Sequence, residues 1–208
     1  MPKKAENIKL SILILSIPTR FDIVKPLIDK LLNQIGDRED VEILSLMDNK
    51  SLHIYEKRNE LLNIARGSHI AWLDDDDDVA DNYVECLTQA IETAPFSDVI
   101  SFNQTCYLEG KKALVFASMD NLTNDPVVLD WSSQKYKDTL RRPWHWCVWK
   151  TTLARSERFR EKYDAGGQSC EDIDWLERLY PKVRDHIYLK DQFLHIYRWS
   201  SKTTESVL

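Results

Sequence analysis

The sequence predicts an α/β fold in which helices flank a mostly parallel, twisted sheet. Apolar runs of strand length alternate, along the first half of the chain, with segments whose apolar residues recur at helical spacing. The connections between these runs are about a dozen residues or longer, as crossovers between parallel strands require. Polar residues cluster where the first three runs end, and sheets of this class bind ligands beyond the carboxyl ends of their strands. We therefore expect one crevice at that edge.

The first half of the chain supports this fold element by element. The run from Ile8 to Ser16 is nearly continuous and rich in branched apolar residues, which is typical of a strand buried on both faces. Helical periodicity follows Pro18 and ends at Gly36, and a second helix ends at Gly67. The expected strands cover residues 8–16, 41–47, 69–73 and 98–102, and the expected helices cover residues 22–35, 54–65 and 82–94.

The second half is less regular. Turn residues and a short helical period still indicate its elements, and one segment holds three of the seven tryptophans. The expected elements are a hairpin over 104–118 around Glu109-Gly110, a mobile loop over 119–137, the tryptophan-rich segment 141–150, a helix over 171–179 and a final strand over 186–197.

The composition narrows the classes of function. The 208 residues carry 28 Lys and Arg against 34 Asp and Glu, a formal charge of −6. A protein that binds along nucleic acid without catalysis is therefore disfavoured, because phosphate binding needs an excess of basic charge. The longest apolar run, Leu10 to Ile17, is short of a membrane span and no cleavage site follows it, so we expect neither a transmembrane segment nor a signal peptide. Four dispersed cysteines favour reduced thiols and a cytoplasmic location.

Five consecutive aspartates, Asp74 to Asp78, directly follow the third apolar run. Neighbouring carboxylates repel one another, so the run alone opposes folding. A divalent cation would offset this repulsion, and Mg²⁺ or Mn²⁺ takes carboxylate oxygens together with the phosphate oxygens of a nucleotide. A solvated acidic loop is the alternative when the run is taken by itself.

The acidic run belongs to a longer pattern. Lys57-Arg58-Asn59 lies on a predicted helix, Gly67 follows that helix, and the next strand ends in the aspartates. This pattern resembles the inverting family-2-type glycosyltransferases of the GT-A fold, the fold of the nucleotide-diphospho-sugar transferase superfamily, in which a strand ends in a D-x-D metal motif. The resemblance spans residues 10–201 and implies one GT-A domain over 1–208. Its nucleotide-sugar-binding half would be 8–103, and its acceptor-binding and catalytic half would be 104–208.

The resemblance also implies donor-binding roles for residues at the strand ends. Asp48 would accept a hydrogen bond from the base, typically uracil, and Arg198 or Lys202 would clamp the leaving diphosphate. Asp76 would be the direct metal ligand, with the register inside the run open by one residue. The implied sets are Pro18, Arg20, Asp48, Arg58, Asp74, Asp75 and Arg198 for the nucleotide sugar, and Asp76, Asp74 and His195 for Mn²⁺ or Mg²⁺. A histidine that alternates with apolar residues in a strand, as His195 does, is often only packed.

A late acidic motif supplies the candidate base. Inversion at the sugar carbon needs a group that takes the proton of the attacking hydroxyl. In the resembling family this group is the Asp of a Glu-Asp pair at the start of a late helix, which implies Asp172. Glu171 beside it would contact the acceptor, and Asp174 is the rival candidate. The same carboxylates would also stabilise a helix N-terminus through the macrodipole.

The tryptophan-rich segment is the candidate acceptor platform. Aromatic faces stack on sugar rings, and Trp-His-Trp beside Arg141-Arg142 is unusual for a core, although most single tryptophans are core residues. We therefore expect an acceptor contact from Trp146, and the resemblance implies acceptor contacts from Trp149 and Lys150. We expect acceptor recognition to be confined to residues 104–150.

These features together predict a metal-dependent inverting glycosyltransferase that moves a sugar from a nucleotide sugar, with a UDP-sugar as the expected donor, to an acceptor hydroxyl. Two other classes stay open. A metal-dependent nucleotidyltransferase would release pyrophosphate, and a non-enzymatic acidic module would bind Ca²⁺ through residues 74–78. The acceptor is open among a glycan, a lipid-linked sugar, a protein side chain and a hydroxylated DNA base.

Overall fold

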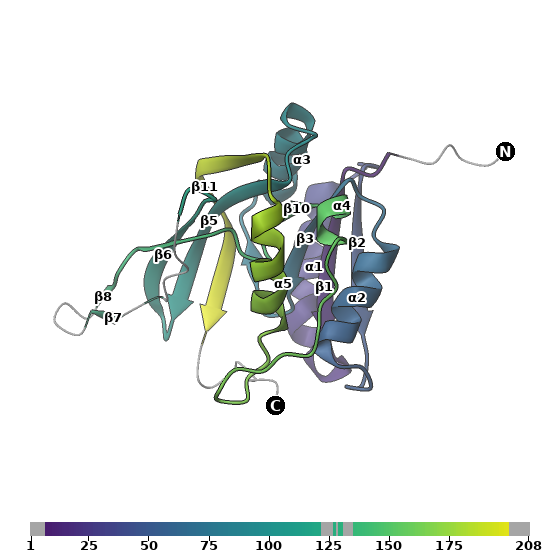
Figure 1. The fold of residues 1–208 in the computed structure, drawn as a ribbon. Helices are drawn as coiled ribbons and strands as arrows, with labels where there is room; N and C mark the ends of the chain where they lie inside the picture. The colour runs from purple at the N-terminus through teal and green to yellow at the C-terminus, as the bar shows by residue number, and fades with distance from the viewer. Residues whose placement is uncertain (1–6, 122–126, 128, 131–134, 200–208) are drawn as a thin grey trace.

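The computed structural model describes residues 7–121, 127, 129–130 and 135–199, and Figure 1 shows a sheet with helices on both sides. The helices are η1 (Pro18–Arg20), α1 (Phe21–Ile35), α2 (Ile54–Ile64), α3 (Tyr83–Thr93), α4 (Thr151–Ala154), α5 (Glu171–Leu179) and η2 (Tyr180–Lys182). The strands are β1 (Leu10–Ser16), β2 (Val41–Met47), β3 (His69–Asp74), β4 (Asp78–Val79), β5 (Val99–Leu108), β6 (Lys111–Ala117), β7 (Leu129–Asp130), β8 (Lys135–Tyr136), β9 (Thr139–Arg141), β10 (Val148–Lys150) and β11 (His186–Trp199).

The main sheet has the strand order β2-β1-β3-β10-β5-β11-β4, with β6 paired to β5 and β9 paired to β6. Strands β2, β1 and β3 are parallel to one another, and β5 is parallel to β11. Because β10 is antiparallel to both β3 and β5, those two strands also run the same way. The five principal strands therefore share one direction, which confirms the mostly parallel sheet flanked by helices.

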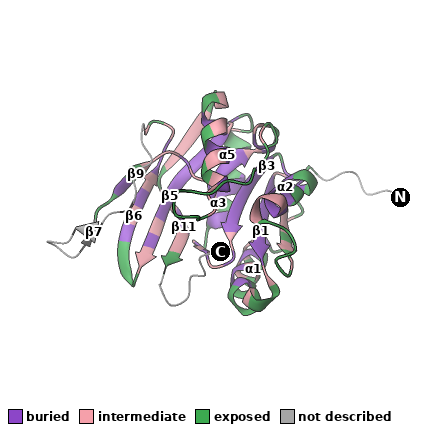
Figure 2. Cartoon of the chain, turned by 60° about the horizontal axis from the view of Figure 1, so that its bottom comes forward, coloured by how far each residue is buried: buried purple, intermediate pink, exposed green. Residues whose placement is uncertain are grey.

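Two apolar cores cover the two faces of the sheet, and Figure 2 shows the buried central strands between exposed outer helix surfaces. On one face α1 and α3 pack against Leu10, Ile12 and Ile14 of β1. On the other face α2, α4 and α5 pack against Leu13 and Leu15 of the same strand. Side chains alternate across a strand, so a continuous apolar run is what a strand with helices on both faces needs.

The tryptophan-rich segment contributes a central strand that the sequence did not predict. Strand β10 pairs Val148 with Ala71 and Lys150 with His69, antiparallel to β3. Residues just before β10 therefore lie near the carboxyl end of β3, whereas Lys150 lies at its amino end. This antiparallel return brings residues 144–147 to the edge of the sheet where Asp74 ends β3.

The expected strands and helices of the first half are confirmed, although the fourth strand is longer than expected because β5 continues to Leu108. The chain then returns as β6 through Glu109 and Gly110, which both have positive φ, 47° and 77°, as a tight hairpin turn requires. Most of the expected mobile loop over 119–137 lies outside the described residues. Within the part of the chain that the structure describes, no helix is long and apolar enough to cross a membrane.

Candidate active site

The candidate site lies where β3 ends beside the first turn of α5. Asp74 is the last residue of β3, and Asp172 is in the first turn of α5. The imidazole of His145 lies between them, with Nε2 3.6 Å from Asp74 Oδ2 and Nδ1 3.0 Å from Asp172 Oδ2. One side chain thus joins the acidic run and the Glu-Asp pair, which are far apart in the sequence.

His145 is positively charged at neutral pH. Burial alone would lower the pKa of its imidazole, but Asp172 and Asp74 raise that pKa to about 9. The pKa of Asp172 lies below its usual range because His145 outweighs the opposite effect of burial. The pKa of Asp74 is lowered as well, by His145 and Arg58 against burial. Both carboxylates are therefore ionised at neutral pH.

Arg58 on α2 connects the two halves of the chain. Its Nε donates to Glu171 Oε1 at 3.0 Å, and its Nη2 lies 3.4 Å from Asp74 Oδ1. The guanidinium is buried and lies over the Trp72 ring, 5.2 Å from the centroid. Ser169 Oγ donates to the second carboxylate oxygen of Glu171 at 2.6 Å. The side chain of Glu171 is 4% exposed and both of its oxygens have protein partners, and the acceptor contact expected from it stays a prediction.

All five aspartates lie close to basic or imidazole side chains of the protein. Asp74 faces Arg58 and His145, and Asp76 faces Arg20. The partners of the other three are Arg20 and Ser16 for Asp75, His195 for Asp77, and Lys30 and Arg198 for Asp78. Asp75 is therefore closed to an incoming ribose, since its carboxylate, 11% exposed, is bonded at 2.6 Å to Arg20 and at 2.8 Å to Ser16 Oγ.

The side chains of Asp74, Asp76 and Asp78 are 42%, 26% and 30% exposed, whereas those of Asp75 and Asp77 are buried. Arg20 Nη2 reaches Asp76 Oδ2 at 2.9 Å, yet the pKa of Asp76 is raised, first by burial and then by Asp77. A carboxyl group in that environment gains from an additional positive charge nearby. Asp74 and Asp76 are the two of these three that match the D-x-D pair, and Asp78 is held by Lys30 and Arg198.

The residues expected to bind the nucleotide lie at the ends of β1 and β2. Pro18 and Arg20 form η1 immediately after β1. Asp48 follows β2, where it forms an ion pair with Lys57 and accepts hydrogen bonds from Ser51 Oγ and Leu52 N, both at 2.9 Å. Lys57, with Ser51 and Leu52, holds the pKa of the Asp48 carboxyl well below its usual range despite burial.

The expected diphosphate clamp, Arg198, lies on β11 at the other side of the acidic run. Its Nη2 is 3.1 Å from Asp78 Oδ2, and its guanidinium lies 5.1 Å from the centroid of the Tyr107 ring. Its side chain is 54% exposed, so it remains accessible to an anion. Lys202, the alternative, lies outside the described residues.

His195 is packed in its strand, and its role as a metal ligand stays a prediction. Its Nε2 lies 2.9 Å from Asp77 Oδ2, and its Nδ1 lies 2.8 Å from Gln104 Nε2. The ring is 1% exposed and stacks on Trp146, with centroids 5.1 Å apart and planes 8° apart. Nδ1 thus has a protein partner, whereas the buried Nε2 makes no hydrogen bond and only lies close to the Asp77 carboxylate.

Among the described residues, no three His, Cys, Asp or Glu side chains are placed as a preformed metal-ligand set. Mg²⁺ commonly takes only one or two protein carboxylates and completes its octahedron with waters and substrate phosphates. Asp74 and Asp76 fit this second type of donor set, since both are accessible at the carboxyl end of β3.

The structure does not bring the three residues of the expected acceptor platform together at the site. Trp149 is fully buried, its Nε1 donates to Trp144 O at 3.0 Å, and its ring packs against Trp175. Lys150 lies at the amino end of β3, opposite the site, where its Nζ donates to Phe96 O at 3.0 Å. Trp146 lines the cavity beside the site, but it is 2% exposed, so it offers no open ring face for a sugar.

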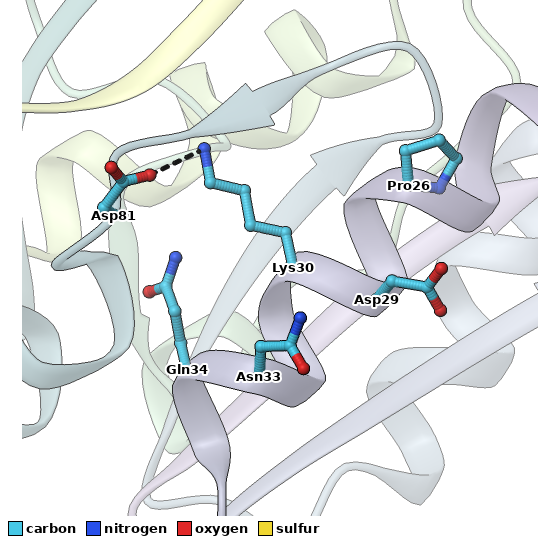
Figure 3. A pocket seen from close by; sticks show the side chains of 6 residues that line it. All are labelled: Pro26, Asp29, Lys30, Asn33, Gln34 and Asp81. Carbon is cyan, nitrogen blue, oxygen red and sulfur yellow. Dashed lines mark ion pairs between the residues drawn. The ribbon is translucent and has the colours of Figure 1, made fainter.

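A cavity of about 320 Å³ opens next to the candidate site, on the side of β5, β9 and β11. Its wall includes Asp74 and His145 from the site, together with Arg141 and Trp144 from the segment before β10. A second hollow, between α1 and the loop before α3, is shown in Figure 3. Lys30 in that hollow already pairs with Asp81 at 3.1 Å, so the hollow offers no comparable reactive group.

The sequence interpretation missed His145, although it contacts both acidic motifs. The available signal was its position between two tryptophans, in a segment predicted to face the acceptor. Without the antiparallel register of β10 with β3, that position could not be assigned to the end of β3. Arg141 was read only as part of a basic stretch, and its place in the cavity wall was missed for the same reason.

No family model matches this chain, and no curated protein matches its sequence. Solved structures do match it. S. aureus TarS 1-349 in complex with UDP covers 93% of this chain and 61% of its own, with a TM-score of 0.66 and 16% identity. TarS 1-349 in complex with UDP-GlcNAc covers 96% and 60%, with a TM-score of 0.63 and 15% identity. A structure titled S. aureus TarS covers 93% and 37%, with a TM-score of 0.59 and 14% identity.

The chain has a GT-A-like glycosyltransferase fold. At this identity the likeness establishes the fold alone, and the chain spans about three fifths of the length of TarS 1-349. In a GT-A-like fold, as in other open α/β sheets, ligands bind beyond the carboxyl ends of the parallel strands. Asp74, Asp76, His145 and Asp172 all lie at that edge.

Proposed function

We propose that the protein is a metal-dependent inverting glycosyltransferase that transfers a sugar from a UDP-sugar to an acceptor hydroxyl. The observation that carries the proposal is the shared contact of Asp74 and Asp172 with His145. A donor-side carboxylate and a candidate base that reach one imidazole can act on the two sides of one reacting sugar. A Ca²⁺-binding acidic module would leave Asp172 without a role.

The choice of UDP as the nucleotide rests on the fold. TarS, which shares this fold, has been crystallised with UDP and with UDP-GlcNAc. In this chain we assign the nucleotide to the ends of β1 and β2, where Pro18, Arg20 and Asp48 lie. Asp48, kept ionised by Lys57, is a suitable acceptor for the N–H group of a uracil ring.

Asp74 and Asp76 would hold Mn²⁺ or Mg²⁺, with the remaining ligands from the donor diphosphate and water. When bound, the cation neutralises the charge that develops on the leaving diphosphate. The accessibility of both carboxylates and the raised pKa of Asp76, caused by burial and by Asp77, support this assignment. Arg198 is the candidate for the second positive charge at the diphosphate, because its exposed guanidinium lies at the end of the same acidic run.

Asp172 acts as the general base in this proposal. Its carboxylate takes the proton of the acceptor hydroxyl while the hydroxyl oxygen bonds to the anomeric carbon and the bond from that carbon to the diphosphate breaks on the opposite face. His145 fixes the carboxylate through its 3.0 Å contact, and the backbone N of Ile173 donates to Asp172 Oδ1 at 2.8 Å. Asp174 is less suited, because Arg178 holds it in an ion pair at 2.7 Å.

The test is a product assay with a panel of UDP-sugars and Mn²⁺. We expect the wild-type protein to release UDP, whereas a nucleotidyltransferase would release pyrophosphate. The Asp172→Asn variant should release UDP at least about a hundredfold more slowly, since general-base catalysis commonly contributes that much. Its affinity for UDP should be unchanged. The matched control is Asp174→Asn, which should keep the wild-type rate, and a folded Asp172→Asn protein with wild-type turnover would refute the assignment.

A further inference from the structure

Arg141 projects from β9 into the wall of the cavity beside the candidate site. Its backbone is fixed, since its carbonyl oxygen accepts hydrogen bonds from Ser118 N at 3.0 Å and from Asn121 Nδ2 at 2.7 Å. The guanidinium carbon lies 4.0 Å from the centroid of the Trp144 ring. A rigid backbone and a stacked guanidinium leave this cation little freedom to move away from the cavity.

The charge of Arg141 is not neutralised by a neighbouring side chain. Among the side chains that the structure describes, no carboxylate lies within ion-pair distance of it, and its buried Nε has no hydrogen-bond partner. Burial lowers the pKa of Arg141, and an arginine stays charged even so. The other charged groups of the cavity are already paired, Asp77 with His195 and Asp74 with His145 and Arg58. Arg141 is partly buried, and a cation without a counter-charge in such a place is stabilised by an anionic ligand.

The position of Arg141 points to the acceptor side of the reaction. Strand β9 is attached through β6 to β5, whereas the residues assigned to the nucleotide follow β1 and β2 on the far side of β3 and β10. His145, which lines the same cavity as Arg141, contacts the Asp172 carboxylate at 3.0 Å. A molecule that enters the cavity and presents a hydroxyl to Asp172 would therefore meet Arg141 with another of its groups.

We propose that this cavity binds the acceptor, and that the acceptor is a hydroxyl compound with an anionic group, phosphate or carboxylate, which Arg141 binds through its guanidinium. This inference rests on the proposed glycosyltransferase function, because it assigns the second substrate of the same site. A guanidinium with free N–H groups binds phosphate or carboxylate oxygens in bidentate geometry, and the Trp144 ring next to it offers an apolar face to a sugar or polyol.

The experiment compares three sugars that differ only at carbon 6. Glucose 6-phosphate, glucuronate and glucose are titrated calorimetrically into protein saturated with UDP and Mn²⁺, so that the diphosphate position is already filled. We expect at least one of the two anionic sugars to bind about tenfold or more tightly than glucose, as a charge-assisted hydrogen bond implies. The phosphate and carboxylate arms show which anion the cavity prefers.

Three variants make the test specific. Arg141→Gln should abolish the preference for the anionic sugar, and Arg141→Lys should retain part of it, because lysine keeps the charge but not the bidentate geometry. The matched control is Arg142→Gln, which removes the neighbouring guanidinium, placed over Tyr180 and outside the cavity wall. This control should keep the full preference.

Each alternative outcome is decisive. The inference is overturned if UDP-loaded wild-type protein binds all three sugars equally, or if folded Arg141→Gln keeps the preference. It is also overturned if Arg141→Gln weakens binding of UDP itself, because Arg141 would then belong to the donor diphosphate. Failure of wild-type protein to bind UDP would instead refute the proposed function. The sugar titration without UDP would still measure whether Arg141 attracts an anion.

Discussion

Along its strand order the main sheet has a regular side, β2, β1 and β3, and an irregular side, β10, β5, β6, β9 and β11, and the two differ in strand direction and connection. Strands β2, β1 and β3 are parallel and are joined by α1 and α2, so their carboxyl ends fall at one edge by topology alone. Beyond β3 the chain reverses, with β10 antiparallel between β3 and β5 and with β6 returning along β5. The regular side positions the acidic end of β3, whereas the irregular side supplies His145, Arg141 and Asp172. The composition of the candidate site therefore depends on the antiparallel strand β10, where the chain reverses direction.

The largest effect on stability is expected at the ion pair between Arg58 and Glu171, which connects the two sides. Arg58→Ala leaves the carboxylate of Glu171 buried without its partner and should lower the free energy of unfolding by about 3–5 kcal/mol. Urea unfolding measures this loss. The control is Lys25→Ala, which removes an exposed pair with Asp29 and should cost less than about 1 kcal/mol. Equal losses in the two variants would mean that Arg58 does not join the sides.

The charge of His145 gives the next largest effect, through pH. The pKa of its imidazole is about 9 in the folded protein because Asp172 and Asp74 outweigh burial, against about 6.5 in an unfolded chain. The stabilisation is therefore complete below about pH 6.5 and is lost as the pH rises through about 9. The loss should be at most about 3 kcal/mol.

Urea unfolding at about pH 6 and about pH 9.5 measures this dependence. In His145→Gln the decline between the two pH values should shrink, because the amide does not titrate in that range. The same decline in wild type and variant would assign the pH dependence to other groups.

A smaller effect on stability tests whether Trp149 is a core residue or part of an acceptor platform. Trp149→Phe removes part of a buried ring and the hydrogen bond to Trp144 O, and should cost about 1–3 kcal/mol of unfolding free energy. Affinity for UDP should not change. Trp199→Phe, at a ring 37% exposed, is the control and should stay within about 0.5 kcal/mol. A stable Trp149→Phe protein would contradict the core assignment.

The smallest effect is expected at Lys150, because β10 carries it to the amino end of β3. Lys150→Ala should change the unfolding free energy by less than about 1 kcal/mol, since its contact with Asp98 is long, 3.8 Å, and partly solvated. It should leave the rate of UDP release from a UDP-sugar unchanged. A Lys150→Ala protein with impaired turnover would place the amino end of β3 in the catalytic site, against the register of β10.

The periodicity of apolar residues was sufficient to predict the strands and helices of the regular side. The continuous apolar run of β1 and the four-residue spacing in α1 each reflect a local physical requirement, burial on two faces and burial on one stripe. The position of Asp74 followed from the end of an apolar run in the same way. The hairpin at Glu109-Gly110 could also be predicted, because its turn requires positive φ, a conformation that favours glycine.

The strand order of the irregular side could not be predicted from the sequence, because it depends on pairing between segments that are far apart in the chain. Three residues of β10 carry no periodic signal, and only their register with His69 to Ala71 decides which neighbours reach the site. Trp149 was therefore taken for a platform although it is core, and His145 was overlooked although it joins the two acidic motifs. His195 was assigned to a metal from the family resemblance, and its neighbours Asp77 and Gln104, which are remote in the sequence, were not predicted.

The most direct test of the central claim is a calorimetric titration of UDP, with and without Mn²⁺, into wild-type protein and Asp76→Asn. The account predicts that Mn²⁺ tightens UDP binding about tenfold or more in the wild type, and that the Asp76→Asn variant loses this gain while it remains folded. UDP binding that ignores Mn²⁺, or a variant that keeps the full gain, would contradict the assignment of the donor diphosphate to the acidic end of β3.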